Sequence, residues 1–592
     1  MIALALGEDK TRKELIPFLT QEIKQDKFCD EVKVFIAEVL GTFVEFVGGV
    51  TEAHCLFKPL VELCLFDEST VRDMAIDSIN LIGKKLSRTQ IATHLVPAVN
   101  ELVNERWFTP RVAACGLLAL ACPSGASDYP KDVEAIIEKF SVLADDDDPM
   151  VRRAAALRIS DLAEKLVEDT PGSSLVEKDL FELFTRFLTD SKEESVRVNA
   201  LRSCARVCKL IKPDKKFKLL DKEFRGCVEN VKSWRLRIAC AEVIADVAVA
   251  AGDDERCIAI LQDFYKTLQE DKEEAVKIAT AQCAARFAKA LLASECPRVD
   301  SSMPAVGNTF SKDVIFPSVK KLVLHEFAGE TPSRPELTSV LMDLAAPMGK
   351  EASLRLLLPH IISLCNADDN LNVRLAVINS FEDYIGVVGL RDDQQGDEFL
   401  KLVLDLSKAK VWRIRHKILL LLPVLAKELG VEVFMKYFGE SLSSFAGDSA
   451  ALIRTDFCHV MCRVVEGGVN PDWLQMMIVP ILLKAKDLKH YQMQAVFLDW
   501  VVLAKHLRQD IIETQLLQPT IKDFLFHEVP NMRIYAVRAL IIAASRLKDS
   551  QVATRPIIEH LQDALGKEQQ DTENVDRNVV EEIEKAIKEY TD

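Results

Sequence analysis

The sequence predicts an all-α protein, a solenoid of about fourteen repeats that each hold two antiparallel helices and together form a curved superhelix. First, a basic residue recurs roughly every 40 residues. Second, the segment after each copy carries apolar residues at helical spacing. Third, 22 Gly and 22 Pro among 592 residues leave few residues for turns, which argues against a many-stranded β fold. We therefore expect residues 1–592 to form one array rather than several compact domains.

The repeat unit is recognised by an apolar residue followed by Arg or Lys at the start of a helical stripe. Val151-Arg152, Leu236-Arg237 and Ile414-Arg415 are clear copies, and Val32-Lys33 and Tyr491-Gln492 are weaker ones. The basic residue or its stand-in falls at 33, 72, 111, 152, 197, 237, 277, 334, 374, 415, 454, 492, 533 and 577. Successive spacings are 38 to 45 residues, except for one of 57. A period near 40 with two helices per unit indicates repeats of the HEAT or armadillo type.

Each unit follows the same plan. A first helix often opens with proline, as at Pro17 and Pro97, because the first helical turn tolerates the missing N–H. A short acidic turn follows, such as residues 145–148. The second helix then carries the basic residue in its opening turns, with small residues that permit close packing.

The recurring basic residues have two possible roles, a ligand-binding stripe or an Asp–Arg ladder that orients neighbouring repeats. A residue that keeps one repeat position from end to end favours the ladder. We therefore expect these side chains to be paired rather than free.

The array divides into N-terminal repeats over 1–292, an inserted turn-rich loop over 293–312, middle repeats over 313–390 and C-terminal repeats over 391–592. The 57-residue spacing contains the loop. Residues 2–7 resemble the end of a second helix, which suggests that most of one repeat is missing before them, and residues 579–590 suggest a capping helix.

Large aromatic residues stand just before the second helix in three repeats. They are Trp107 with Phe108, Trp234 with Arg235, and Trp412 with Arg413. Trp beside Arg is typical of protein-binding hot spots, which favours a contact surface. The alternative is a staple, in which the Trp folds back onto its own helix. At the equivalent turn Asp148-Pro149-Met150 reads, by itself, as an N-cap and helix start.

The sequence contains no nucleophile elbow, zinc-protease helix, Walker loop or dinucleotide-binding glycine motif, so we predict no enzyme and no cofactor. His416 is interpreted as a helix residue rather than a base. The Cys204/Cys208 and Cys458/Cys462 pairs share helix faces but lack further ligands, so core packing is favoured over a metal site. The net charge of −16 argues against nucleic-acid binding, and no apolar run approaches the length of a membrane span.

Several motifs closely resemble the 65 kDa scaffold (A) subunits of protein phosphatase 2A, a fifteen-repeat HEAT family. The resemblance runs from residue 2 to about 577 and implies that the chain keeps repeats 2 to 15. It rests on segments 2–7, 40–43, 47–49, 107–109, 114–116, 149–156, 233–237, 412–415 and 429–432.

This resemblance implies a non-catalytic scaffold whose intra-repeat turns bridge two partners. The N-terminal repeats would bind a regulatory B subunit and the C-terminal repeats the catalytic subunit, in a heterotrimer. The implied regulatory-subunit contacts are Trp107, Phe108, Asp148, Pro149, Met150, Trp234 and Arg235. The implied catalytic-subunit contacts are Trp412, Arg413, Leu452, His490, Tyr491, Val529 and Asn531. We expect a cytoplasmic and nuclear protein without nucleic-acid or membrane partners.

Two other classes stay open. A HEAT transport receptor of the importin type or another adaptor would bind basic cargo and a small GTPase, and the acidic charge allows it. A HEAT-like DNA glycosylase needs a basic concave face, which the charge speaks against.

Overall fold

The computed structural model describes residues 2–123, 130–169, 179–295, 309–326, 332–390, 394–547, 551–570 and 576–591. These residues form helices, turns and connecting segments, with no strand among them. The chain divides into two units, Met1–Met303 with Gly307–Ala328, and Pro304–Val306 with Gly329–Asp592. No helix in the described ranges has the length and apolar content needed to cross a membrane.

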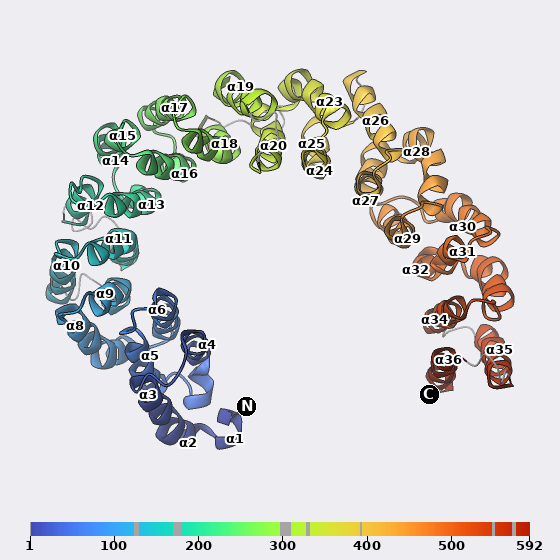
Figure 1. Ribbon diagram of the computed structural model, residues 1–592, viewed down its shortest axis with the longest axis horizontal. Coiled ribbons are helices and arrows are strands. Elements are labelled where there is room, and N and C mark those ends of the chain that lie inside the picture. Colours follow the sequence, from blue (N-terminus) through green and yellow to red (C-terminus); the bar gives the residue numbers. More distant parts are fainter. Residues whose placement is uncertain are drawn as a thin grey trace. The chain divides into compact units, whose positions relative to one another are not determined.

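The first unit contains two rows of helices, which Figure 1 shows from blue to green. The row of second helices comprises α4 (Asp30–Gly41), α6 (Ser69–Gly83), α9 (Phe108–Ala121), α11 (Pro149–Asp169), α13 (Glu194–Leu210), α16 (Trp234–Ala251) and α18 (Glu274–Glu295). The row of first helices comprises α2 (Glu8–Lys10), α3 (Ile16–Lys24), α5 (Phe57–Leu63), α7 (Arg88–Gln90), α8 (Val96–Asn104), α10 (Pro130–Ala144), α12 (Phe181–Leu188), α14 (Pro213–Leu219), α15 (Arg225–Val228), α17 (Glu255–Gln269) and α19 (Phe316–Lys321). The short α1 (Ile2–Leu6) precedes them.

The second unit repeats this arrangement in yellow to red (Figure 1). Its second helices are α20 (Arg334–Asp343) with α21 (Ala345–Met348), α24 (Leu371–Asn379) with α25 (Phe381–Val388), α27 (Trp412–Leu429), α29 (Ala451–Glu466), α31 (Tyr491–Leu498) with α32 (Trp500–Leu503), α34 (Pro530–Leu547) and α36 (Arg577–Thr591). Its first helices are α22 (Lys350–Ala352), α23 (Leu358–Ala367), α26 (Gln394–Ser407), α28 (Val431–Ala446), α30 (Val479–Lys486), α33 (Gln509–Ile511) and α35 (Gln551–Gln570).

The predicted repeat is confirmed, because each of the fourteen positions derived from the period lies in the opening turns of one of these second helices. The predicted loop 293–312 falls mostly outside the described residues. On its described flanks the chain is helical, since α18 continues through Glu295 and residues 309–312 are helical.

The expectation that proline opens the first helix is wrong in several repeats. Helix α7 begins at Arg88, widens into a π-helical turn over Ile91–Leu95 and continues as α8, so Pro97 lies inside a longer helical segment. Proline lacks the N–H of the regular helix and its ring crowds the carbonyl four residues earlier, and a widened turn accommodates both defects. The same π turn precedes Pro17, Pro317, Pro359 and Pro480.

The core lies between the two rows and continues from repeat to repeat. Close approach of second helices depends on small residues, since a Cβ on Gly116 of α9 would lie 2.9 Å from Ile76 Cγ2 of α6. Polar side chains also join neighbouring second helices by binding main-chain carbonyls. Ser78 Oγ donates to Ala37 O at 2.8 Å, and Ser203 Oγ donates to Ala156 O at 3.0 Å.

Candidate partner-binding turns

A ladder of ion pairs joins successive intra-repeat turns. The arginine that stands fourth in a second helix, or first in the case of Arg334, reaches the aspartate in the turn of the next repeat. Arg111 Nε donates to Asp146 Oδ2 at 2.7 Å and its Nη2 to Asp146 Oδ1 at 2.9 Å. Further rungs are Arg152–Asp190, Arg237–Asp271, Arg334–Asp368 and Arg415–Asp448. At these repeats the predicted ladder is confirmed, and the ligand-binding alternative loses its basis there because the side chains are engaged.

The same arginine also holds its own turn together. Arg415 Nη1 donates to Ala409 O at 2.7 Å and to Lys410 O at 3.0 Å, while Asp448 Oδ1 accepts the N–H of Ala450 at 2.8 Å. Burial alone would raise the pKa of Asp448, but the hydrogen bonds from Arg415 and Ala450 together hold it below its ordinary value. Each rung therefore fixes the shape of two turns at once.

The ladder position in the repeat of α31 differs from the predicted one. We expected Gln492 as the stand-in, but Gln494 is the fourth residue of α31, and its Nε2 donates to Leu488 O at 2.8 Å, as Arg415 does to Ala409. Gln494 Oε1 lies 3.1 Å from His527 Nε2 in the next turn, so an amide–imidazole contact replaces the ion pair there. In this register Tyr491 opens α31 as Trp412 opens α27.

Trp–Arg pairs are presented at the start of two second helices. Trp234 is 41% exposed and the guanidinium carbon of Arg235 lies 4.9 Å from its ring centroid. Trp412 is 37% exposed, and the guanidinium carbon of Arg413 lies 5.1 Å from the centroid of its ring. Stacking of the guanidinium on the indole holds both side chains in place while leaving them accessible. The two pairs therefore have the same geometry, one in each unit.

Trp107 is oriented differently and is 58% exposed. Its Nε1 donates to Asp67 Oδ1 at 3.1 Å in the turn of the preceding repeat, and Thr109 Oγ1 donates to the same carboxylate at 2.8 Å. These two bonds lower the pKa of Asp67. Trp107 thus bonds across a repeat boundary, which neither the staple nor the free-contact interpretation anticipated, and its ring still faces solvent beside Phe108.

Asp148 caps α11, because its Oδ1 accepts the N–H of Met150 at 2.8 Å. Pro149 and Met150 are exposed beside it. The capping interpretation of this turn is therefore confirmed, and the exposed Met150 still offers an apolar contact next to the cap.

The remaining predicted contacts in the second unit also lie at helix openings. Leu452, His490, Tyr491 and Asn531 are exposed, and Val529 is half-buried with its N–H bonded to His527 Nδ1 at 3.0 Å. The structure brings each predicted residue to an intra-repeat turn, and whether partners contact it stays a prediction.

Two exposed apolar residues in these turns are not among the predicted partner contacts. Val231 is 87% exposed three residues before Trp234, and Leu488 is exposed three residues before Tyr491. A large apolar side chain within the turn itself was the available signal. By contrast, Trp473 and Trp500 are buried, and Trp500 Nε1 donates to Thr520 Oγ1 at 3.0 Å.

The cysteine pairs lie in the core, as expected. Cys204 and Cys208 are buried with their sulfurs 3.9 Å apart, and Cys458 and Cys462 are buried on α29. Within the described ranges, no group of three or more His, Cys, Asp and Glu is arranged to hold a metal ion. His416 lies in α27 as predicted, with Nε2 2.7 Å from Asp456 Oδ2.

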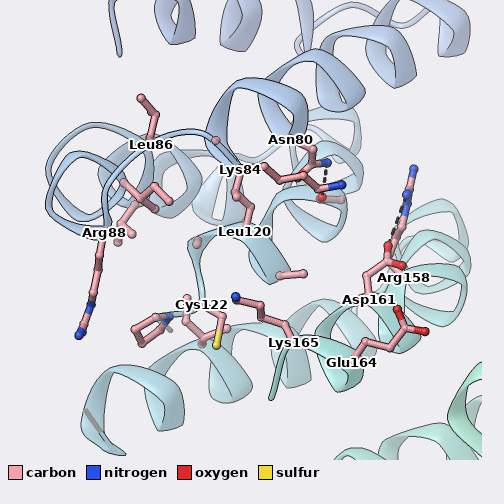
Figure 2. A pocket seen from close by; sticks show the side chains of 18 of the residues that line it. Asn80, Lys84, Leu86, Arg88, Leu120, Cys122, Arg158, Asp161, Glu164 and Lys165 are labelled. Carbon is pink, nitrogen blue, oxygen red and sulfur yellow. Dashed lines mark hydrogen bonds and ion pairs between the residues drawn. The ribbon is translucent and has the colours of Figure 1, made fainter. Parts of the chain in front are cut away.

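A groove of about 1030 Å³ lies away from these turns, near the far ends of α6, α9 and α11 (Figure 2). Leu120 and Cys122 line it together with the basic residues Lys84 and Arg88. On one side Arg206 of α13 pairs with Asp161 at 2.6 Å and with Glu164 at 2.5 Å. These ion pairs join α11 to α13 and stabilise the seam between two repeats.

No family model matches the chain. Curated relatives match part of it: the beta isoform of the 65 kDa regulatory A subunit of serine/threonine-protein phosphatase 2A from Rattus norvegicus is 41% identical over 169 residues, 28% of this chain and 27% of that protein. The alpha isoform from Arabidopsis thaliana is 43% identical over 162 residues, 27% of this chain and 26% of the relative. The corresponding regulatory A subunit from Schizosaccharomyces pombe is 34% identical over 252 residues, 42% and 41% of the two chains.

Among solved structures, Kap95p in its complex with RanGDP is similar with a TM-score of 0.51 and 12% sequence identity, covering 91% of this chain and 72% of that one. This likeness concerns the fold alone. The chain spans about a quarter of the length of the first two relatives and about two fifths of the third. Over that part it is similar to the 65 kDa regulatory A subunits of protein phosphatase 2A, which confirms the resemblance predicted from its turn motifs.

Proposed function

We propose that this chain is a non-catalytic scaffold of a protein phosphatase 2A-type complex. The turns of the second unit bind the catalytic subunit, and those of the first unit bind a regulatory subunit. Similarity to the A subunits supports this assignment. The observation that carries it is the pair of accessible Trp–Arg stacks, Trp234/Arg235 and Trp412/Arg413, each beside a ladder arginine that is already paired with an aspartate.

The mechanism is bridging rather than chemistry. Aromatic and guanidinium groups held at helix openings lose little side-chain entropy when a partner covers them, which favours binding at these positions. Holding a phosphatase and a substrate-selecting subunit on one array raises the local concentration of substrate at the active site. The metals and the catalytic residues belong to the partner in this proposal.

The test is co-elution on a sizing column with a phosphatase 2A catalytic subunit. We expect the wild-type chain to co-elute and the Trp412→Ala/Arg413→Ala double variant to lose at least tenfold in affinity. Both side chains are exposed, so thermal unfolding should be unchanged.

The matched control is Trp234→Ala/Arg235→Ala, which removes the same stack from the other unit. This variant should still bind the catalytic subunit but no longer bind the regulatory one. If the wild-type chain fails to co-elute with the catalytic subunit, the scaffold proposal is wrong and an adaptor or transport role takes its place. If both double variants bind like wild type, the anchors are misassigned.

A further inference from the structure

The ladder changes chemistry at the rung that begins with Arg197. In the next turn Asn230 stands where Asp190 and Asp271 stand in the turns on either side. Asn230 keeps the capping role, since its Oδ1 accepts the N–H of Lys232 at 3.1 Å and of Ser233 at 2.9 Å. Asp190 Oδ1 caps its own turn in the same way. The amide, however, carries no negative charge for Arg197.

Arg197 instead turns toward sulfur. Its Nε donates to Leu188 O at 3.1 Å, and its Nη2 donates to Cys227 Sγ at 3.5 Å. Cys227 belongs to α15 and is fully buried; its Sγ lies 3.9 Å from Leu188 O, and the Cys240 thiol on α16 is the group that lowers its pKa most. A guanidinium, an acceptor thiol and a second thiol therefore meet inside the seam between α13 and the following repeat.

This contact distinguishes Cys227 from other buried thiols near ladder arginines. The charge of Arg72 lowers the pKa of Cys64, and the charge of Arg374 lowers that of Cys365. No hydrogen bond from either arginine to these sulfurs occurs among the described contacts. Burial raises the pKa of both thiols to about 12. The pKa of Cys227 falls to about 7, because the hydrogen bonds from Cys240 and Arg197 outweigh burial and the nearby Glu223 carboxylate.

We propose that Cys227 is an oxidation site for hydrogen peroxide, with Arg197 stabilising its thiolate and Cys240 acting as the resolving thiol. The Cys227 thiolate attacks one peroxide oxygen, the O–O bond breaks, and a sulfenic acid and hydroxide form. The sulfur of the protonated Cys240 thiol then attacks the Cys227 sulfur. The S–OH bond breaks, hydroxide leaves and takes up the Cys240 proton as water, and a disulfide joins α15 to α16.

Oxidation has a structural consequence at this seam. The thiolate supplies the negative charge that aspartate supplies at other rungs, so a disulfide removes that charge from beside the half-buried Arg197. The contact between α13 and the next repeat weakens there. The array would then carry one joint that responds to peroxide.

The experiment exposes the full-length chain to hydrogen peroxide, blocks the remaining thiols and follows each cysteine peptide by mass spectrometry. We expect Cys227 to be oxidised at least tenfold faster than Cys365 and a Cys227–Cys240 disulfide to accumulate. In Cys240→Ser, dimedone should instead trap a sulfenic acid at Cys227. Oxidation of Cys227 no faster than Cys365 would overturn the proposal.

Asn230→Asp supplies the matched variant. It restores a carboxylate to Arg197, so the ladder becomes more complete while the thiolate loses its cation, and oxidation of Cys227 should slow about tenfold. If local opening of the fold alone set the oxidation rate, Asn230→Asp would leave the ratio of the Cys227 and Cys365 oxidation rates as it is in the wild-type chain. Thiolate absorbance near 240 nm gives a readout that needs no access to the sulfur. A transition near pH 7 that Cys227→Ser removes supports the proposal, and its absence in the wild-type chain refutes it.

Discussion

The pKa of a carboxyl group in this protein depends on its burial and on the groups that face it. Asp448 is ionised in the fold because Arg415 and a backbone N–H face it, whereas Asp499, which follows α31, is half-buried and its burial raises its pKa to about 7. The two carboxyl groups therefore contribute to stability with opposite pH dependence. The sequence alone shows two aspartates and does not reveal that their pKa values shift in opposite directions.

The Asp499 carboxyl gives a prediction about pH. Its pKa is raised from 3.8 in the unfolded chain to about 7 in the fold, so the folded state holds the proton more tightly between these values. Stability contributed by this group is therefore full below pH 4, falls as the pH rises to 7 and is constant above it. Asp499→Asn should raise the free energy of unfolding at pH 8 by on the order of 1–3 kcal/mol and have little effect at pH 4.

The measurement is urea unfolding at both pH values. Asp369→Asn, at an exposed position, is the control and should show no such difference. Equal stability of wild type and Asp499→Asn at pH 8 would contradict the prediction.

At the level of the helix, much of the structure could be predicted and a few features could not. The period of the basic residue gave the second helices, because a packed seam demands the same side chain at the same height in each repeat. The π turns before Pro17 and Pro97 were missed, since a proline looks the same at a helix start and after a widened turn. The Gln494 register was missed because glutamine has no charge to reveal its role. The bond of Trp107 to Asp67 spans 40 residues and leaves no local pattern.

The last helix illustrates how an element depends on its apolar face. In α36, Val579, Ile583 and Ala586 are buried in one cluster with Leu540 of α34 and Leu561 of α35. Ile583→Ala should therefore lower the free energy of unfolding by about 2–4 kcal/mol, through lost burial and a cavity.

Hydrogen exchange resolved along the chain is the suitable measurement, because the loss should appear first in α34, α35 and α36. Glu584→Ala changes an exposed neighbour on the same helix and should leave exchange as in the wild-type chain. Uniform acceleration over the whole second unit would show that α36 does not behave as a local cap.

For the molecule as a whole, the ladder makes stability a sum of neighbour contacts, because each rung joins one turn to the next. Asp271 lies in the first unit and Asp448 in the second, and no repeat is shared between their rungs. We expect Asp271→Asn and Asp448→Asn each to cost about 1–3 kcal/mol, since the amide keeps the caps but loses the ion pair.

The double variant should show the sum of the two losses within about 0.5 kcal/mol. Denaturant unfolding of the two single variants and the double variant measures this directly. A coupling energy well above that limit would mean that distant rungs communicate through more than neighbour contacts. The exposed Asp369→Asn again serves as a reference.

The spacing of the ladder also bears on how the chain is made. The aspartate of each rung follows its arginine by 33 to 38 residues, as in Arg415–Asp448 and Arg152–Asp190. A ribosome adding roughly 5–20 residues per second supplies the missing carboxylate within a few seconds of the arginine. During synthesis, only the newest Arg–Asp rung then waits for its carboxylate, and every earlier Arg–Asp rung is already closed. Assembly can thus follow translation from the N-terminal end, with one incomplete joint at a time.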